Sequence, residues 1–382
     1  MKIAQIAPIW YSIPPKKYGG TESVISILTE QLVKKGHNVT LFATKDSQTN
    51  SHLVSFFEKG IAEEIFPTNR EFFLYPLIHF IKSIEVVKKN QFDIVHCHLG
   101  TLADYILLAL TYNLPNVIFT AHIQFPTEST QPLRWQTLNL FKNIPFISIS
   151  NNQRGNLNLN FIKTIYHGIK IEDFTFEEII YEKENSGYIF WISRLSQQKG
   201  IVEAIKVSKK THKKLFFTSA INSKFDEEYY NQYIKPYLTD PEITFIQELN
   251  PIEKSFYFRH AKLFLFPIQW EEPFGLVMIE SMACGTPVVA FARGSVPEVI
   301  KDGETGFIVN PSNDDIRGDF IIKKTGIEGL CEAVERIYSM PEEQYRKMRK
   351  ACREHVEKNF TVEKMVDEYE KIYKEILNKK TS

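Results

Sequence analysis

Apolar runs of strand length alternate with segments of helical period along this chain, and this alternation limits the fold more than any other feature. In the first half, the expected strands are 2–8, 38–44, 93–99, 116–122 and 145–150. In the second half, they are 187–193, 214–220, 242–249, 262–268 and 287–292. Such alternation is typical of parallel sheets that helices cover on both faces. The sequence therefore predicts an α/β protein built from doubly wound sheets.

The chain is too long for a single domain. Its 382 residues exceed the about 250 to 300 residues at which one hydrophobic core stops growing. The stretch 172–186 is polar and acidic and has no clean period, as expected of an interdomain connection. We therefore expect one domain over 1–180, a second over 181–358, and a C-terminal helical segment over 359–382.

Charge and cysteine usage exclude several classes of protein. Lys plus Arg and Asp plus Glu each number 46, so no net field would attract nucleic acid. The four cysteines form no C-x-x-C pair, which fits a reducing, cytoplasmic compartment. The N-terminal apolar run is broken by Pro8 and Pro14 and is too short for a signal peptide. The most apolar window, 72–81, is far shorter than the about 20 residues that a membrane span needs.

The strongest chemical signal is a pair of carboxylates, Glu272 and Glu280, on either side of an apolar helix start. Pro273 suits the first helical position, and Gly275 would let a ligand approach the N–H groups of the first turn. Together they predict an anion site. Glu280 lies among apolar residues, so we expect it to be partly buried. A buried charge needs a partner, which here is either distant in the sequence or a ligand with hydroxyl donors.

Two cations, Arg194 and Lys199, lie in the loop that follows the first strand of the second half. Loops after the carboxyl ends of parallel strands line the ligand crevice of such sheets. A guanidinium and an ammonium together match a diphosphate and can neutralise the charge that grows on it as a bond to it breaks. The alternative is a helix-start loop whose basic side chains face solvent.

A glycine loop, Gly19 and Gly20, follows the first strand and precedes a helix that Thr21 could cap and Gly36 could end. Two glycines permit close backbone approach to a ligand, although such a pair is commonly only a turn. The G-x-G-x-x-G pattern of a dinucleotide fold is missing here, which argues against an NAD enzyme.

Histidines end two neighbouring strands of the first half. His96 and His98 point to one face of their strand, but the sequence offers no further zinc ligands at suitable spacing. His122 lies where the next strand meets its loop, and we expect it to contact substrate. The alternative is a hydrogen-bonded histidine in a polar rim.

With these motifs, nearly the whole chain resembles the retaining glycosyltransferases of family four, which have the GT-B fold. Glu272 and Glu280 reproduce the E-x7-E signature of that family, and Arg194 and Lys199 its R-L-x-x-x-K-G pair. The glycine loop, Pro297-Glu298 and the segment 303–307 also match. The resemblance implies two Rossmann-like domains that face each other across a cleft, with a C-terminal helix that crosses back to the first domain.

The resemblance also implies an activity. Such a protein is a hexosyltransferase that moves a sugar from a nucleoside diphosphate sugar to an acceptor hydroxyl, with retention and without a metal or other cofactor. The acceptor would be a carbohydrate, a lipid-linked sugar or a small molecule. A nucleotide-sugar epimerase, a GT-B phosphorylase and a non-catalytic sugar-nucleotide-binding protein are the alternatives.

The implied roles fall on residues that match the motifs. Glu280 would bind the ribose hydroxyls, Glu272 the hydroxyls of the sugar, and His122 the donor sugar or the acceptor. Arg194 and Lys199 would bind the departing phosphate. The remaining expected donor contacts are backbone groups of Gly19, Gly20, Phe274, Gly275 and Leu276.

The sequence departs from the family pattern at four positions: Ser193 stands for Gly, Ser281 for Ala, Ile123 for an acidic residue, and His167 for Asn. Ile123 weakens any role of His122 that needs a neighbouring carboxylate. The apolar residues of 72–80, with Lys82, Lys88 and Lys89 close behind, would suit a lipid-linked acceptor or a peripheral membrane contact, and core packing is the alternative.

Overall fold

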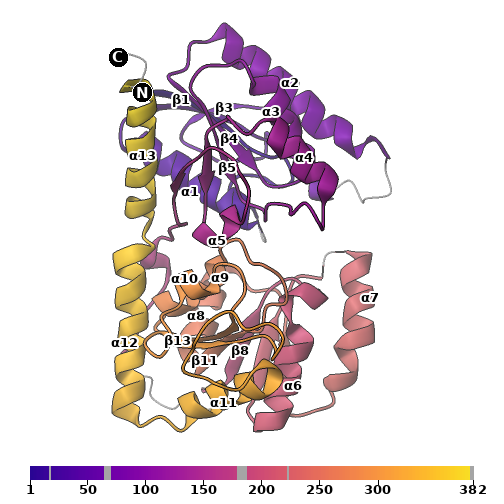
Figure 1. Ribbon diagram of the computed structural model, residues 1–382, viewed down its shortest axis with the longest axis vertical. Helices are drawn as coiled ribbons and strands as arrows, with labels where there is room; N and C mark the ends of the chain where they lie inside the picture. The colour runs from indigo at the N-terminus through magenta and orange to yellow at the C-terminus, as the bar shows by residue number, and fades with distance from the viewer. Residues whose placement is uncertain (17–18, 64–69, 179–186, 222, 379–382) are drawn as a thin grey trace. The chain divides into compact units, whose positions relative to one another are not determined.

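The computed structural model describes residues 1–16, 19–63, 70–178, 187–221 and 223–378 (Figure 1). The chain forms two compact units, one of Met1–Gly168 with Val362–Ser382 and the other of Ile169–Thr361. Each unit contains one parallel sheet whose strands alternate with helices along the chain. The predicted α/β class with two doubly wound sheets is confirmed.

The division between the units lies earlier than residue 180. Ile169 N donates to Phe360 O at 2.9 Å, and a guanidinium N–H of Arg353 donates to Phe174 O at 2.7 Å. These contacts tie the start of the connecting segment to the second unit. The segment Val362–Ser382 returns to the first unit, and residues 179–186 of the expected connection lie outside the described residues.

The first unit has a seven-stranded sheet in the order β3-β2-β1-β4-β5-β6-β7. Its strands are β1 (Lys2–Ile6), β2 (Asn38–Phe42), β3 (His52–Val54), β4 (Ile94–Leu99), β5 (Val117–Ala121), β6 (Phe146–Ser148) and β7 (Phe161–Thr164). Its helices are α1 (Gly20–Lys34), α2 (Leu74–Lys89), α3 (Ile106–Thr111), α4 (Pro132–Leu140), α5 (Asn151–Arg154) and α13 (Val362–Asn378). Short 3-10 turns lie at Ile61–Glu63, Arg70–Phe73 and Ala103–Tyr105.

The second unit has a six-stranded sheet in the order β10-β9-β8-β11-β12-β13. Its strands are β8 (Ile189–Ile192), β9 (Leu215–Thr218), β10 (Ile243–Ile246), β11 (Leu263–Phe266), β12 (Val288–Phe291) and β13 (Gly306–Val309). Its helices are α6 (Ile201–Thr211), α7 (Lys224–Tyr233), α8 (Pro251–His260), α9 (Leu276–Ala283), α10 (Val296–Val299), α11 (Gly326–Tyr338) and α12 (Glu342–Asn359). Short 3-10 turns lie at Ile171–Asp173, Gln197–Lys199 and Lys235–Tyr237.

The first helix ends as its sequence predicts but begins differently. Gly36 follows α1 with a φ of 85°, and its N–H bonds Val33 O at 2.9 Å, as in a glycine helix end. The start differs from the prediction, since α1 begins at Gly20 with Gly19 before it, so Thr21 lies inside the helix and does not cap it.

The apolar window 72–81 divides between core and surface. Pro76 and Phe80 are buried, whereas Phe73, Leu74 and Ile78 are 55%, 46% and 41% exposed. The window therefore packs in the core along one face of α2 only. None of the helices in the described ranges combines the length and the apolar character that crossing a membrane requires.

Each sheet has a point where the order of its strands reverses. It lies between β1 and β4 in the first unit and between β8 and β11 in the second. Loops at the carboxyl ends of the strands beside such a point form the ligand crevice of open α/β sheets. In the second unit these loops carry Arg194, Lys199 and Glu272, and in the first unit they carry Gly19 and Gly20.

Candidate active site

The two loops beside the reversal point of the second sheet are locked together. Gly200 has a φ of 76°, and a Cβ there would overlap Pro267 O, so only glycine fits. Gln269 N also donates to Gln198 O at 2.8 Å. The loop that carries Lys199 is therefore fixed against the loop that leads to Glu272.

Lys199 and Glu272 are in direct contact between these two loops. Lys199 Nζ lies 2.6 Å from Glu272 Oε2, and their side chains are 10% and 12% exposed. Trp270 Nε1–H donates to the same Oε2 at 2.9 Å, and Lys199 Nζ lies 4.8 Å from the centroid of the Trp270 ring. Arg194, in the same loop as Lys199, is exposed. Sequence reasoning missed Trp270, although its position two residues before Glu272 was a local signal.

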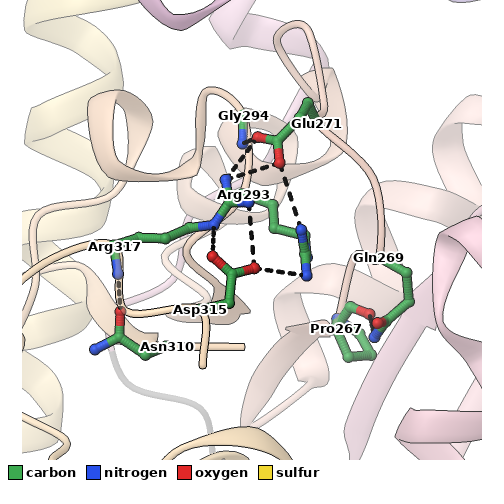
Figure 2. A network of polar contacts seen from close by, with 8 residues as sticks. All are labelled: Pro267, Gln269, Glu271, Arg293, Gly294, Asn310, Asp315 and Arg317. Carbon is green, nitrogen blue, oxygen red and sulfur yellow. Dashed lines mark hydrogen bonds and ion pairs between the residues drawn. The ribbon is translucent and has the colours of Figure 1, made fainter. Parts of the chain in front are cut away.

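A second network holds the residue beside Glu272 (Figure 2). Arg317 and Arg293 reach the Glu271 carboxylate at 2.7 Å and 3.4 Å, and Gly294 N donates to it at 2.7 Å. Figure 2 shows Asp315 facing both guanidinium groups from the other side, and it pairs with them at 2.8 Å and 3.0 Å. The Glu271 carboxylate is therefore held by two guanidinium groups and one backbone N–H.

Gly294 also fixes Glu272 directly. A Cβ at Gly294, where φ is 58°, would overlap both the backbone N and the O of Glu272. Ser295 N donates to Glu272 O at 2.9 Å. This close approach requires glycine, and it positions the Glu272 side chain.

Glu280 is buried, as expected, with 8% of its surface exposed. Lys254 Nζ, on α8, lies 2.7 Å from Glu280 Oε1. Within the described parts of the chain, the buried Oε2 has no hydrogen-bond partner. The partner proved to be distant in the sequence, and sequence reasoning missed Lys254 because only the packing of α8 on α9 brings it there. One carboxylate oxygen thus remains to accept a hydrogen bond.

The start of α9 differs from the prediction. The helix begins at Leu276, and Gly275 precedes it with a φ of 78°. Pro273 therefore lies in the preceding loop and not at the first helical position. Met278 N donates to Gly275 O at 3.0 Å, and the earlier N–H groups of the first turn have no partner within the helix, so the positive end of α9 lies close to Glu272 in the sequence.

The glycine loop of the first unit is tightly packed. A Cβ on Gly19 would lie 2.7 Å from Pro15 Cβ and 2.9 Å from Glu22 Oε2, which explains the glycine. Gly20 is the first residue of α1. Tyr18, which precedes this pair, lies outside the described residues.

Two buried acids lie behind this loop, and sequence reasoning gave neither a role. Burial raises the pKa of Glu22 to about 7, with a smaller contribution from Asp104. Burial also raises the pKa of Asp104 to about 7, although Gly100 N and Thr101 N donate to its Oδ2 at 2.8 Å and 2.7 Å.

The histidines of the first unit form a buried chain with their neighbours. His98 Nδ1 lies 3.0 Å from His122 Nε2, and His122 Nδ1 lies 3.4 Å from His167 Nε2. His98 Nε2 contacts Gln5 Oε1 at 2.6 Å, and His96 bonds Tyr373 and Thr120, each at 2.8 Å. Across the described ranges, no group of three or more His, Cys, Asp or Glu side chains could hold a metal ion.

Burial makes these imidazoles hard to protonate. It lowers the pKa of His122 to about 3 and the pKa values of His96, His98 and His167 well below the ordinary value. All four are therefore neutral near pH 7.

The expected site residues divide between the two units. Gly19, Gly20 and His122 belong to the first unit. In the second unit, Lys199 and Glu272 are in direct contact. That unit holds the larger group of expected site residues: Arg194, Lys199, Glu272, Phe274, Gly275, Leu276 and Glu280.

Comparison with known proteins identifies related chains. A model of glycosyl transferases group 1 matches residues 173–355, and a model of glycosyltransferase family 4 matches residues 18–172. An uncharacterized glycosyltransferase of Methanocaldococcus jannaschii is 23% identical in a 345-position alignment that covers 81% of this chain and 86% of that protein.

Solved structures share the fold. A sucrose-phosphate synthase from Thermosynechococcus elongatus gives a TM-score of 0.78 at 19% identity over 99% of both chains. Anabaena HepE in complex with UDP-glucose gives 0.71 at 15% identity over 98% of this chain and 100% of that one. These likenesses confirm the predicted GT-B architecture.

Proposed function

The chain belongs to the group 1 glycosyltransferases, and we propose that it transfers a hexosyl group from a nucleoside diphosphate sugar to an acceptor hydroxyl with retention of configuration. One observation carries the choice of donor. Glu280 is buried, its Oε1 is paired with Lys254, and its Oε2 has no hydrogen-bond partner among the described residues. A buried carboxylate oxygen in this state costs free energy unless a ligand donates to it. A ribose supplies two vicinal hydroxyls for this purpose.

Lys199 and Arg194 would bind the diphosphate. Both lie in the loop that follows β8, beside the reversal point of the sheet. The positive end of α9 adds N–H donors from the neighbouring loop, including those near Gly275 and Leu276. These groups stabilise the leaving diphosphate more than the intact donor, because its negative charge grows as the sugar bond breaks.

Glu272 would accept hydrogen bonds from the hydroxyls of the sugar. Glu272 Oε2 lies 2.6 Å from Lys199 Nζ, and both side chains are shielded from solvent. When a donor binds, the ammonium can turn to the phosphate while Trp270 Nε1–H continues to hold the carboxylate. The pair is thereby prepared for a substrate that carries both an anion and hydroxyl donors.

Retention follows from attack on the face that the leaving group departs from. The acceptor oxygen would form a bond to the anomeric carbon while the bond between that carbon and the phosphate oxygen breaks. The phosphate oxygen would take the proton of the acceptor hydroxyl. No protein nucleophile or metal enters this step, since Arg194 and Lys199 supply the positive charge. Binding of the donor sugar or acceptor from the first unit would fall to His122, and Gly19 and Gly20 would allow close approach of the backbone.

The compartment and the acceptor rest on two separate observations. All four cysteines are buried and unpaired, which supports a reducing cytoplasm. Phe73, Leu74 and Ile78 are exposed near Lys82 on α2, which supports a lipid-linked acceptor or a peripheral membrane contact. The solved HepE complex holds UDP-glucose, so uridine donors are a natural first choice.

The test is a panel of uridine, guanosine and adenosine diphosphate sugars, each with and without a broad set of acceptors. The proposal expects release of nucleoside diphosphate only when acceptor is present, and NMR of the product should show the anomeric configuration of the donor. Product without any acceptor would indicate an epimerase. Binding without turnover would indicate a sensor, and an inverted product would overturn the proposed mechanism.

A further inference from the structure

The donor and acceptor roles in the histidine chain of the first unit can be assigned from its contacts with Gln5. Gln5, on β1, contacts His98 Nε2 with its Oε1 at 2.6 Å, while its Nε2–H donates to the Tyr373 hydroxyl at 3.2 Å. An amide oxygen can only accept a hydrogen bond. His98 therefore carries its proton on Nε2 and presents a lone pair at Nδ1.

The remaining contacts follow from this one. A neutral imidazole has one N–H and one lone pair, and both groups at a nitrogen–nitrogen contact cannot be donors. His98 Nδ1 therefore accepts from His122 Nε2–H across 3.0 Å. His122 Nδ1 then carries the lone pair of that ring, and it accepts a hydrogen bond from His167 Nε2–H across 3.4 Å.

The other branch of the chain runs in the same sense. The Tyr373 hydroxyl accepts from Gln5 and so has its own proton for His96 Nδ1, which lies 2.8 Å away. His96 then donates from Nε2 to Thr120 Oγ1, also at 2.8 Å. Every bond from His167 to Thr120 is thus satisfied with a single polarity, and the buried residues reinforce one another.

His122 is the most exposed imidazole of this chain. His96 and His98 are fully buried and His167 is 4% exposed, whereas His122 is half-buried. Its bond to His98 is the shorter of its two ring contacts, and its contact with His167 is the longer. A ligand would exchange with the longer contact, which places it at Nδ1.

We propose that Gln5 and His98 are positioning residues that hold His122 in its Nε2–H tautomer, so that His122 offers substrate a hydrogen-bond acceptor at Nδ1. The ligand group is therefore a hydroxyl donor, such as a sugar hydroxyl, and not a carbonyl or phosphate oxygen. The assignment of a ligand hydroxyl to His122 Nδ1 rests on the proposed function, in which His122 contacts the donor sugar or the acceptor. The assignment of the His122 tautomer rests on the hydrogen bonds alone.

Nitrogen NMR on protein labelled with ¹⁵N-histidine tests the tautomer without any substitution that could prevent folding. Single His→Gln variants serve only to assign the signals. His98, His122 and His167 should each show a protonated Nε2 and an unprotonated Nδ1 at pH 7. A protonated Nδ1 at His122, or a cationic His122, would overturn the positioning role.

Paired substitutions test the ligand contact. Asn places an oxygen where Nδ1 of His lies, whereas Gln places an N–H where Nε2 lies. His122→Asn should keep about tenfold more kcat than His122→Gln, roughly the effect of one hydrogen bond. Equal losses would contradict contact through Nδ1, and full activity in both variants would remove His122 from the proposed site while the NMR result stands.

The same logic tests His98, which acts only through His122. His98→Asn retains an acceptor for His122 Nε2–H, and His98→Leu does not. Rescue of kcat by the Asn variant, with unchanged donor KM, is expected. If both variants lose kcat equally and the Nε2–H signal of His122 persists in each, His98 has no positioning role.

Discussion

The two units differ in the kind of polar side chain that they hold in shielded positions around their sheets. In the second unit the groups are ions held in pairs, Lys199 with Glu272 and Lys254 with Glu280. In the first unit they are neutral: His98 and its partner His122 are uncharged near pH 7 because burial lowers their pKa values. A side chain in an ion pair can exchange its partner for a charged ligand. A chain of neutral imidazoles can instead fix which atoms donate and which accept hydrogen bonds, but it carries no charge to attract an ion. The difference indicates where an anion would bind.

Removal of the shielded cation should give the largest effect. Lys199→Ala is expected to lower kcat by about 10²- to 10³-fold, because it removes a positive group from the leaving diphosphate. Steady-state kinetics, with a nucleoside diphosphate sugar that the protein turns over, measure this change in kcat. Lys209→Ala is the matched control, since Lys209 is an exposed lysine on α6 that pairs with Asp240 at 3.3 Å. A Lys199 variant as active as the control would place the anion elsewhere.

Acid should destabilise the first unit before the second. Burial lowers the pKa of His79 to about 4 and of His122 to about 3, and His96, His98 and His167 shift in the same direction. The unfolded chain binds these protons below about pH 6.5, so the stabilisation is present above that pH and is lost as the pH falls. The loss is up to about 1.4 kcal/mol per pH unit for each net proton.

Two carboxyls of the first unit act in the opposite sense. Glu22 and Asp104 have pKa values raised to about 7, so their contribution is present at low pH and is lost as the pH rises through 7. The five imidazoles outnumber them, and the net effect below pH 6.5 is destabilising. Hydrogen exchange at pH 7.5 and pH 5 should show the amides of β4 and β5 losing protection more than those of β8 and β11. Equal loss in both sheets would break the comparison.

A methyl group at Gly294 tests how Glu272 is positioned. Gly294→Ala should cost about 3 kcal/mol of unfolding free energy, because the new Cβ overlaps the Glu272 backbone and φ is 58°. Gly187→Ala isolates the backbone term, since Gly187 has a φ of 81° and no atom within 4 Å of an added Cβ. It should cost only about 1 kcal/mol. Urea denaturation compares the two, and equal costs would mean that the contact with Glu272 is unimportant.

The smallest expected effect concerns the more exposed ion pair. The Lys254 side chain is 23% exposed, so solvent screens its attraction to Glu280. Lys254→Met should raise the donor KM by about threefold and leave kcat unchanged, since roughly 0.7 kcal/mol of binding is lost. Lys206→Met, at an exposed position of α6, is the control. A fall in kcat would show that Lys254 acts on the transition state and not on the ribose site.

The interior strands of both sheets were predictable, but of the four edge strands only β10 was. All ten predicted strands are present within a few residues, because buried parallel strands are apolar along their whole length. β3, β7 and β13 were missed. All three lie at the edge of a sheet, and β3 and β7 have no fully buried residue, so their sequences lack a continuous apolar run.

The local structure of the candidate site was predictable where its parts are close in sequence. The burial of Glu280 and the loop position of Lys199 follow from local pattern, and both are confirmed. Lys254 and Asp104 needed the packing of distant segments, which periodicity does not reveal. His96 and His98 were recognised as a pair, but their hydrogen bonds to Tyr373 and Gln5 join the two ends of the chain and carry no sequence signal.

A crystal structure of the protein with a bound nucleoside diphosphate tests the central claim most directly. The account predicts phosphate oxygens within hydrogen-bond distance of Lys199 Nζ and a ribose hydroxyl that donates to Glu280 Oε2. A nucleotide bound away from the loops that follow β8 and β11, or one whose ribose leaves Glu280 Oε2 without a partner, would contradict it.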